Sequence, residues 1–202
     1  MSPQTAALPA LSAEDYLAQE EFASEKHEYI RGEVFAMAGA SDAHVTVTGN
    51  IFAALRSHLR GGPCRAFIAD MKLRVEATDA FFYPDVFVLC NEDAPAQPQC
   101  KTDARLIVEV ASPSTEAFDR GAKFAHYRHL PGLMEYAIVD IAQRGVDLYR
   151  KGADGLWVLH PYAADDVVEF ASVGLDLPLS AVFEDVGVRS SMDADAQHER
   201  LS

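Results

Sequence analysis

The chain has 202 residues and a mass of 22.0 kDa, enough for one domain with a hydrophobic core. Hydrophobic residues make up 49% and charged residues 24%, which excludes collagen-like, coiled-coil and wholly disordered chains. The net charge is −14, with 17 basic against 31 acidic residues. Taken whole, this charge argues against a protein that binds polyanions through excess basic side chains.

The acidic residues gather at the two ends of the chain. Residues 1–30 hold six acids and one base, and residues 154–202 hold ten acids and two bases. The middle, residues 31–153, holds fifteen acids and fourteen bases and is therefore nearly neutral. The charge that bears on ligand binding is therefore that of the middle of the chain.

Cysteine usage and apolar runs indicate the compartment. Cys64, Cys90 and Cys100 have irregular spacing that matches neither a disulfide framework nor a zinc site, so we expect reduced thiols and a cytoplasmic protein. The first basic residue is Lys26, which argues against a secretory signal. No apolar run approaches the ~18–20 residues of a membrane helix, so we expect no membrane contact.

The first predicted elements precede the middle of the chain. We expect residues 1–11 to form a flexible lead, 12–187 a single domain and 188–202 a polar tail. Ser12 starts a first helix, with Asp15 as its capping-box partner.

The middle of the chain alternates helix and strand patterns. A strand over 32–37 precedes a long amphipathic helix over 44–60, which Gly61-Gly62-Pro63 ends. Further strands are predicted at 67–77, 82–89 and 105–111, then a helix over 116–130, then strands at 135–141, 146–150 and 156–162. The order helix, three strands, helix, strand predicts an α/β fold.

Two acidic residues stand out because they lie in apolar strands. Glu109 lies within the run 105–111, where a buried carboxylate is costly unless it is paired, protonated or bound to a metal. Asp85 heads a hydrophobic strand directly after Pro84. If the two strands are neighbours, the carboxylates converge at one sheet edge, where oxygen ligands suit Mg²⁺ or Mn²⁺. The alternative is two strand-end acids bonded to backbone or to an arginine.

Other polar residues allow more than one interpretation. His44 falls within ~20° of Ile51 on the helix and so points inward, as a structural histidine or as a proton shuttle or metal neighbour. Glu33 and Asp70 are further metal or water ligands, or strand-edge acids. Lys72 shares a strand face with Asp70 and is therefore a candidate for a lysine that acts beside the carboxylates. Candidates for phosphate contacts are Arg65, Arg74, Arg120 and Arg128.

Pro84-Asp85 and Glu109-Val110-Ala111 resemble the PD-(D/E)xK nuclease signature, in which two acids hold a divalent metal and a lysine two residues after the second acid assists. The lysine position is Ala111 here, so the match is incomplete. A longer ordered set is similar to the Uma-type family of restriction-endonuclease-like bacterial proteins, over about residues 12–187. That set comprises Gly32-Glu33, Met37, Ser41, His44, Asp70, Pro84-Asp85, residues 108–115, Asp119, Lys123, Tyr127, residues 132–136 and Val139-Asp140.

The resemblance implies a fold and a set of site residues. The fold is a restriction-endonuclease-like mixed β-sheet core of order αβββαβ flanked by helices, here with C-terminal β-hairpin additions. Lys123 would replace the lysine absent at Ala111, although a surface pair with Asp119 is the alternative for it. Asp85, Glu109 and the Val110 carbonyl would hold Mg²⁺ or Mn²⁺, and the catalytic residues would be Asp85, Glu109 and Lys123. The supporting residues would be His44, Asp70, Glu33, Lys72 and Tyr127.

The expected function is a Mg²⁺-dependent endonuclease that hydrolyses phosphodiester bonds in nucleic acid, with DNA as substrate and a homodimer as its form. One alternative is an inactive nuclease-fold module that binds nucleic acid or protein, motivated by Ala111 and the lack of a basic tract. Another is a hydrolase of small phosphate esters that uses the same carboxylates. The near-neutral middle of the chain predicts weak, selective nucleic-acid binding that depends on the metal for charge neutralisation.

Overall fold

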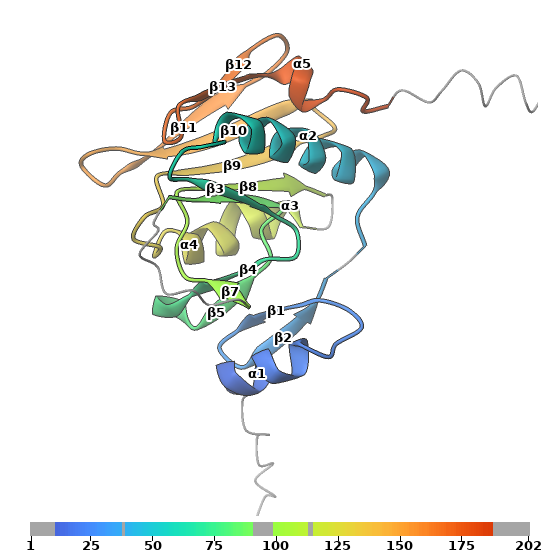
Figure 1. Ribbon diagram of the computed structural model, residues 1–202, viewed down its shortest axis with the longest axis vertical. Coiled ribbons are helices and arrows are strands. Elements are labelled where there is room, and N and C mark those ends of the chain that lie inside the picture. The colour runs from blue at the N-terminus through green and yellow to red at the C-terminus, as the bar shows by residue number, and fades with distance from the viewer. Residues whose placement is uncertain (1–10, 38, 91–98, 113–114, 188–202) are drawn as a thin grey trace, which may run out of the picture.

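The computed structural model describes residues 11–37, 39–90, 99–112 and 115–187 (Figure 1). The predicted lead, apart from Leu11, and the predicted tail lie outside these residues. Within the described ranges, no helix is both long enough and apolar enough to cross a bilayer.

A six-stranded mixed sheet forms the centre of the molecule (Figure 1). The parallel pair β8–β9 lies in its middle, and its other neighbouring strands are antiparallel. Across the sheet the order is β11 (Trp157–Tyr162), β10 (Gly145–Lys151), β9 (Glu135–Asp140), β8 (Leu106–Ala111), β6 (Val86–Leu89) and β3 (Arg65–Ile68).

Helices cover both faces of this sheet, because its strands alternate apolar side chains between two cores. Helix α2 (Asp42–His58) packs Ile51 and Leu55 against Val86 and Val108, with the short helix α5 (Leu179–Val182) beside it. On the other face, Phe124 and neighbouring side chains pack against Phe87 and Ile107. That second layer is a helical segment in three parts: α3 (Glu116–Phe118), the π-helical turn η2 (Asp119–Lys123) and α4 (Phe124–Tyr127).

A second sheet of five strands lies beside the first. Its order is β2 (Glu33–Ala36), β1 (His27–Ile30), β5 (Ala80–Phe82), β4 (Lys72–Val75) and β7 (Cys100–Lys101). Helix α1 (Ala13–Glu20) packs Tyr16 against Tyr29 and Phe81 of this sheet. The predicted cap of α1 is confirmed, since Ser12 accepts a hydrogen bond from the Asp15 amide.

The predicted strands 67–77 and 82–89 are wrong as single elements, since each is divided between the two sheets. Ala69 adopts a left-handed backbone (φ 50°) between β3 and β4, where the chain leaves one sheet for the other. Pro84 lies between β5 and β6, where it needs no ladder donor. A 3₁₀ turn, η1 (Glu76–Thr78), joins β4 to β5.

Two hairpins were not fully predicted. Strand β1 pairs with β2 across the two-residue turn Arg31-Gly32, in which both residues have positive φ, as a tight hairpin requires. Near the end of the domain, β12 (Val167–Phe170) pairs with β13 (Leu175–Pro178).

The expectation of reduced thiols at Cys64 and Cys90 is wrong, because the two residues form a disulfide. Strands β3 and β6 are antiparallel neighbours with Arg65 opposite Leu89, so Cys64 and Cys90 meet at the end of the pair. Their sequence separation of 26 gives no local sign of this pairing. Cys100 is buried in the second sheet.

Candidate active site

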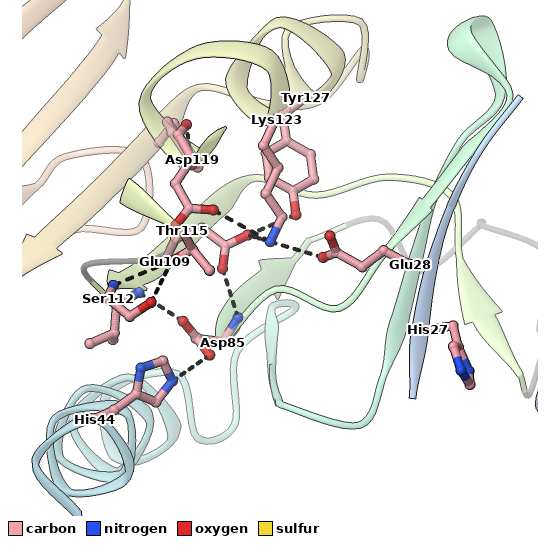
Figure 2. Close-up of polar contacts among 12 residues, drawn as sticks. His27, Glu28, His44, Asp85, Glu109, Ser112, Thr115, Asp119, Lys123 and Tyr127 are labelled. Atoms are coloured by element: carbon pink, nitrogen blue, oxygen red, sulfur yellow. Dashed lines mark hydrogen bonds and ion pairs between the residues drawn. The ribbon is translucent and has the colours of Figure 1, made fainter. Parts of the chain in front are cut away.

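The ends of β6 and β8 bring Asp85 and Glu109 together (Figure 2). Val86 lies opposite Val108, so Asp85, just before β6, lies next to the end of β8. The Val110 amide donates to Asp85 Oδ2 at 2.7 Å, and the Asp85 amide donates to Glu109 Oε2 at 3.3 Å. The convergence expected for neighbouring strands is therefore present.

Lys123 reaches the same place from the π-helical turn η2. Its Nζ lies 3.0 Å from Glu109 Oε1, 2.9 Å from Glu28 Oε1 and 3.7 Å from Asp119 Oδ1. The Lys123 side chain is only 8% exposed, so it does not form a surface pair with Asp119. π-Helical turns are rare and are frequent at functional sites, which suits a turn that directs both Asp119 and Lys123 inward.

Two further side chains orient the carboxylates. The Tyr127 hydroxyl donates to Glu109 Oε1 at 2.8 Å. His44 Nε2 lies 2.9 Å from Asp85 Oδ1. The position of His44 follows from the cap of α2, because Ser41 Oγ accepts from the His44 amide at 3.2 Å in the first helical turn.

Burial and mutual repulsion shift the proton affinities of this cluster. Burial raises the pKa of Glu109 to about 8, with Lys123 opposing the shift and the Asp85 charge adding to it. Burial by itself lowers the pKa of Lys123, but Glu109 and Glu28 outweigh it and hold that pKa above its ordinary value. Burial also raises the pKa of Tyr127, so its hydroxyl stays protonated and can donate.

The cluster carries more acid than base. Glu28, Glu109 and Asp119 surround the ammonium group of Lys123, and Asp85 lies beside Glu109 and is paired with His44. The hydrogen bond to Asp85 raises the pKa of His44 against the opposing effect of burial. Even with His44 protonated, the acidic side chains outnumber the cations, and a further cation would be attracted here.

Three predicted supporting residues lie outside this cluster. Asp70 is exposed and forms an ion pair with Lys26. Lys72 lies over the Tyr83 ring, 5.3 Å from its centroid, because the break at Ala69 directs β4 into the second sheet. Glu33 is exposed on the edge strand β2. Their interpretation as metal or water ligands therefore finds no support in the geometry.

The four arginines predicted to contact phosphate lie in different surroundings. Arg120 is held by Glu116 and Asp147, Arg74 lies over the Phe81 ring and Arg128 over the Phe124 ring. Arg65 lines a surface pocket at the start of β3.

Glu28 and Asp119 are members of the cluster that sequence reasoning did not assign to the site. Glu28 lies on β1, and the Arg31-Gly32 turn before the predicted strand could have revealed that strand's partner. Asp119 and Lys123 are four residues apart, but only the packing of η2 against the sheet shows that both are buried.

Comparisons with known proteins identify the family of this chain. The model of the Uma2 family, described as "Putative restriction endonuclease", matches residues 13–180. The uncharacterized protein slr1290 of Synechocystis sp. is 39% identical over 179 residues, covering 89% of this chain and 94% of the relative. The uncharacterized protein sll1609 of the same organism is 35% identical over 164 residues, covering 80% and 93%.

A solved structure shares the fold. It is the crystal structure of "a putative nuclease belonging to DUF820" from Anabaena variabilis, which superimposes with a TM-score of 0.66 at 17% identity and covers 80% of this chain and 91% of its own. This likeness confirms the predicted restriction-endonuclease-like α/β fold, and the family match covers nearly the whole described domain. The chain belongs to the Uma2 family.

Proposed function

We propose that this protein is a Mg²⁺- or Mn²⁺-dependent endonuclease that hydrolyses phosphodiester bonds in DNA. The observation that carries the proposal is that Asp85, Glu109 and Lys123 converge from three separate elements on one largely buried cluster. The description of the Uma2 family as "Putative restriction endonuclease" favours DNA as the substrate.

The donor set fits a hard divalent ion. The described residues contain no group of three His, Cys, Asp or Glu side chains arranged for a metal. The two carboxylates of Asp85 and Glu109 and the Val110 carbonyl would be the protein ligands. Mg²⁺ commonly binds one or two carboxylates and completes its shell with water and substrate phosphate. The amide and carbonyl of one strand residue face the same neighbour, and the Val110 amide faces Asp85, which puts its carbonyl on that side.

Each side chain then has a distinct part in the chemistry. A bound divalent ion would polarise the phosphate and lower the pKa of a water molecule. Lys123, whose pKa lies above its ordinary value, remains a cation and offsets negative charge that builds up on the phosphate, rather than acting as a base. Tyr127 holds Glu109, and His44 holds Asp85 Oδ1, so both carboxylates keep their orientation.

Cleavage of both strands of a duplex needs two active sites, and the location of DNA suggests where the protein acts. Because each chain offers one such cluster within its described residues and a duplex has two strands, we propose that double-strand cleavage uses a homodimer. We place the activity in the cytoplasm with its DNA substrate. Disulfides are rare in that compartment, and the Cys64–Cys90 bond is an exception to this rule.

Plasmid nicking by the purified chain tests the proposal. We expect nicking with Mg²⁺ or Mn²⁺ and none with EDTA, and a loss of at least ~100-fold in Asp85→Asn and Glu109→Gln. Asp70→Asn is the matched control, because this exposed carboxylate pairs with Lys26 outside the cluster. If Asp85→Asn and Glu109→Gln nick as fast as the wild type, the site is wrong. Calorimetric Mg²⁺ binding without any cleavage would instead favour an inactive module.

A further inference from the structure

A surface pocket lies at the opposite end of α2 and β6 from the carboxylates. It has a volume of about 170 Å³, and three of the side chains that line it are Arg56, Arg60 and Arg65. Asp85 and His44 lie at the start of β6 and α2, whereas Cys90 and Arg56 lie at or beyond their far ends. The same two elements therefore connect the carboxylate cluster to this arginine pocket.

The fold brings the three arginines together by reversing the chain. Arg56 and Arg60 are one helical turn apart at and just beyond the end of α2, whose C-cap is Leu59. Gly61 has a positive φ of 80°, which favours glycine, and lets the chain turn back. The disulfide between Cys64 and Cys90 then links the returning chain to the end of β6. Arg65, the next residue after Cys64, is the first residue of β3.

The arginines are available to a ligand. All three are exposed, and none forms an ion pair with a carboxylate among the described residues. By contrast, Arg120 is held by two carboxylates and Arg150 by another two. The pocket thus gathers three arginines that have no ion-pair partner among the described residues, in a chain of net charge −14. Guanidinium groups match phosphate oxygens with paired hydrogen bonds, so phosphate is the ligand class they suit.

We propose that the arginine pocket binds a backbone phosphate of DNA at a distance from the scissile bond; this rests on the proposed function. At ~1.5 Å per helical residue, His44 and Arg56 are about 18 Å apart along α2. At ~3.3 Å per strand residue, Asp85 and Cys90 are about 16 Å apart along β6. A duplex that runs along α2 and β6, with a rise of ~3.4 Å per nucleotide in one strand, would place a backbone phosphate in the pocket about five base pairs from the catalytic centre.

A helix-stabilising role for these arginines makes a different prediction. Basic side chains near a helix C-terminus interact favourably with its dipole, and Arg56 lies in the last turn of α2. Arg60 directly follows the C-cap and can share this effect, whereas Arg65 lies more than a turn beyond it. If the arginines served only the helix, their replacement would lower the melting temperature and leave DNA affinity unchanged.

The test measures DNA binding by the full chain in EDTA, where no cleavage occurs, as a function of salt. The variant is Arg56→Gln/Arg60→Gln, and the control is Arg31→Gln/Arg144→Gln, which removes the same charge away from the pocket. With a duplex of about 12 base pairs, the pocket variant lowers the slope of log K against log salt by about one, since the pocket holds one phosphate and each phosphate contact contributes about one. The control variant keeps the wild-type slope.

The outcomes separate this inference from the proposed function. If the pocket variant keeps the wild-type slope, or the control lowers it equally, the pocket inference is overturned even while Mg²⁺-dependent nicking continues. If the slope falls as expected but no metal-dependent nicking is found, the pocket binds DNA and the proposed function is wrong. Where both hold, the pocket variant raises the DNA concentration needed for half-maximal nicking and leaves the maximal rate near the wild-type value.

Discussion

Helix α2 and strand β6 present opposite charges in opposite surroundings at their two ends. At one end, Lys123 and Glu109 are buried and hold each other, with Asp85 and His44 paired beside them. At the other end, Arg56 and Arg60 are exposed and make no ion pair with a described carboxylate. Buried charges need partners because desolvation is costly, whereas exposed ones lose little by remaining unpaired. The buried end therefore depends on internal compensation, and the exposed end leaves its charge for a ligand.

The largest effect is expected from removing the buried cation. Lys123→Met leaves Glu28, Glu109 and Asp119 without their shared counter-charge, so we expect the free energy of unfolding to fall by ~3–5 kcal/mol. The loss should be greater at pH 8 than at pH 5, where the carboxyl groups can take up protons. Urea unfolding measures both. The control is Lys26→Met, which breaks an exposed ion pair with Asp70 and should cost at most ~1 kcal/mol. If both variants lost the same free energy of unfolding, the buried lysine would not depend on its partners more than the exposed one does.

The second effect is a pH dependence of stability in the metal-free protein. The pKa values of Glu109, Asp119 and His44 are all raised in the fold, so between about pH 5 and 8 the folded state holds protons that the unfolded state releases. The free energy of unfolding should therefore decrease as pH rises through this window. Thermal unfolding in EDTA at several pH values measures the slope. Glu109→Gln should flatten it, and Asp70→Asn should not. A slope unchanged in Glu109→Gln would argue against a strongly raised Glu109 pKa.

The smallest effect on stability is expected at the exposed end. Arg56→Gln/Arg60→Gln should change the free energy of unfolding by no more than ~0.5 kcal/mol per site, because both side chains are solvated and lack ion-pair partners among the described residues. Denaturant unfolding beside the wild type checks this. A loss comparable to that of Lys123→Met would mean that the arginines stabilise the fold. The charges at the two ends would then contribute to stability alike.

Glu109 and Asp85 could be singled out from the sequence because each interrupts an apolar strand pattern, which is a local anomaly. Lys123 could not, since an Asp119–Lys123 spacing also describes a surface pair. Lys123 was predicted as a site residue only from the family resemblance, and the π-helical turn explains why its side chain is buried beside Glu109. Glu28 was missed because its strand is short and its partner Lys123 is 95 residues away along the chain.

The alternation of apolar and polar residues, the Ser12 cap and the turn at residues 61–63 determined most elements by themselves, because these signals act over a few residues. Only the tertiary structure decided where each strand pairs: Ala69 and Pro84 divide two predicted strands between two sheets, and Lys72 is carried away from the carboxylates. It also decided that Cys64 meets Cys90 and that Arg60 and Arg65 share a pocket with Arg56. Strand pairing and chain reversal depend on contacts between distant residues, which local periodicity does not encode.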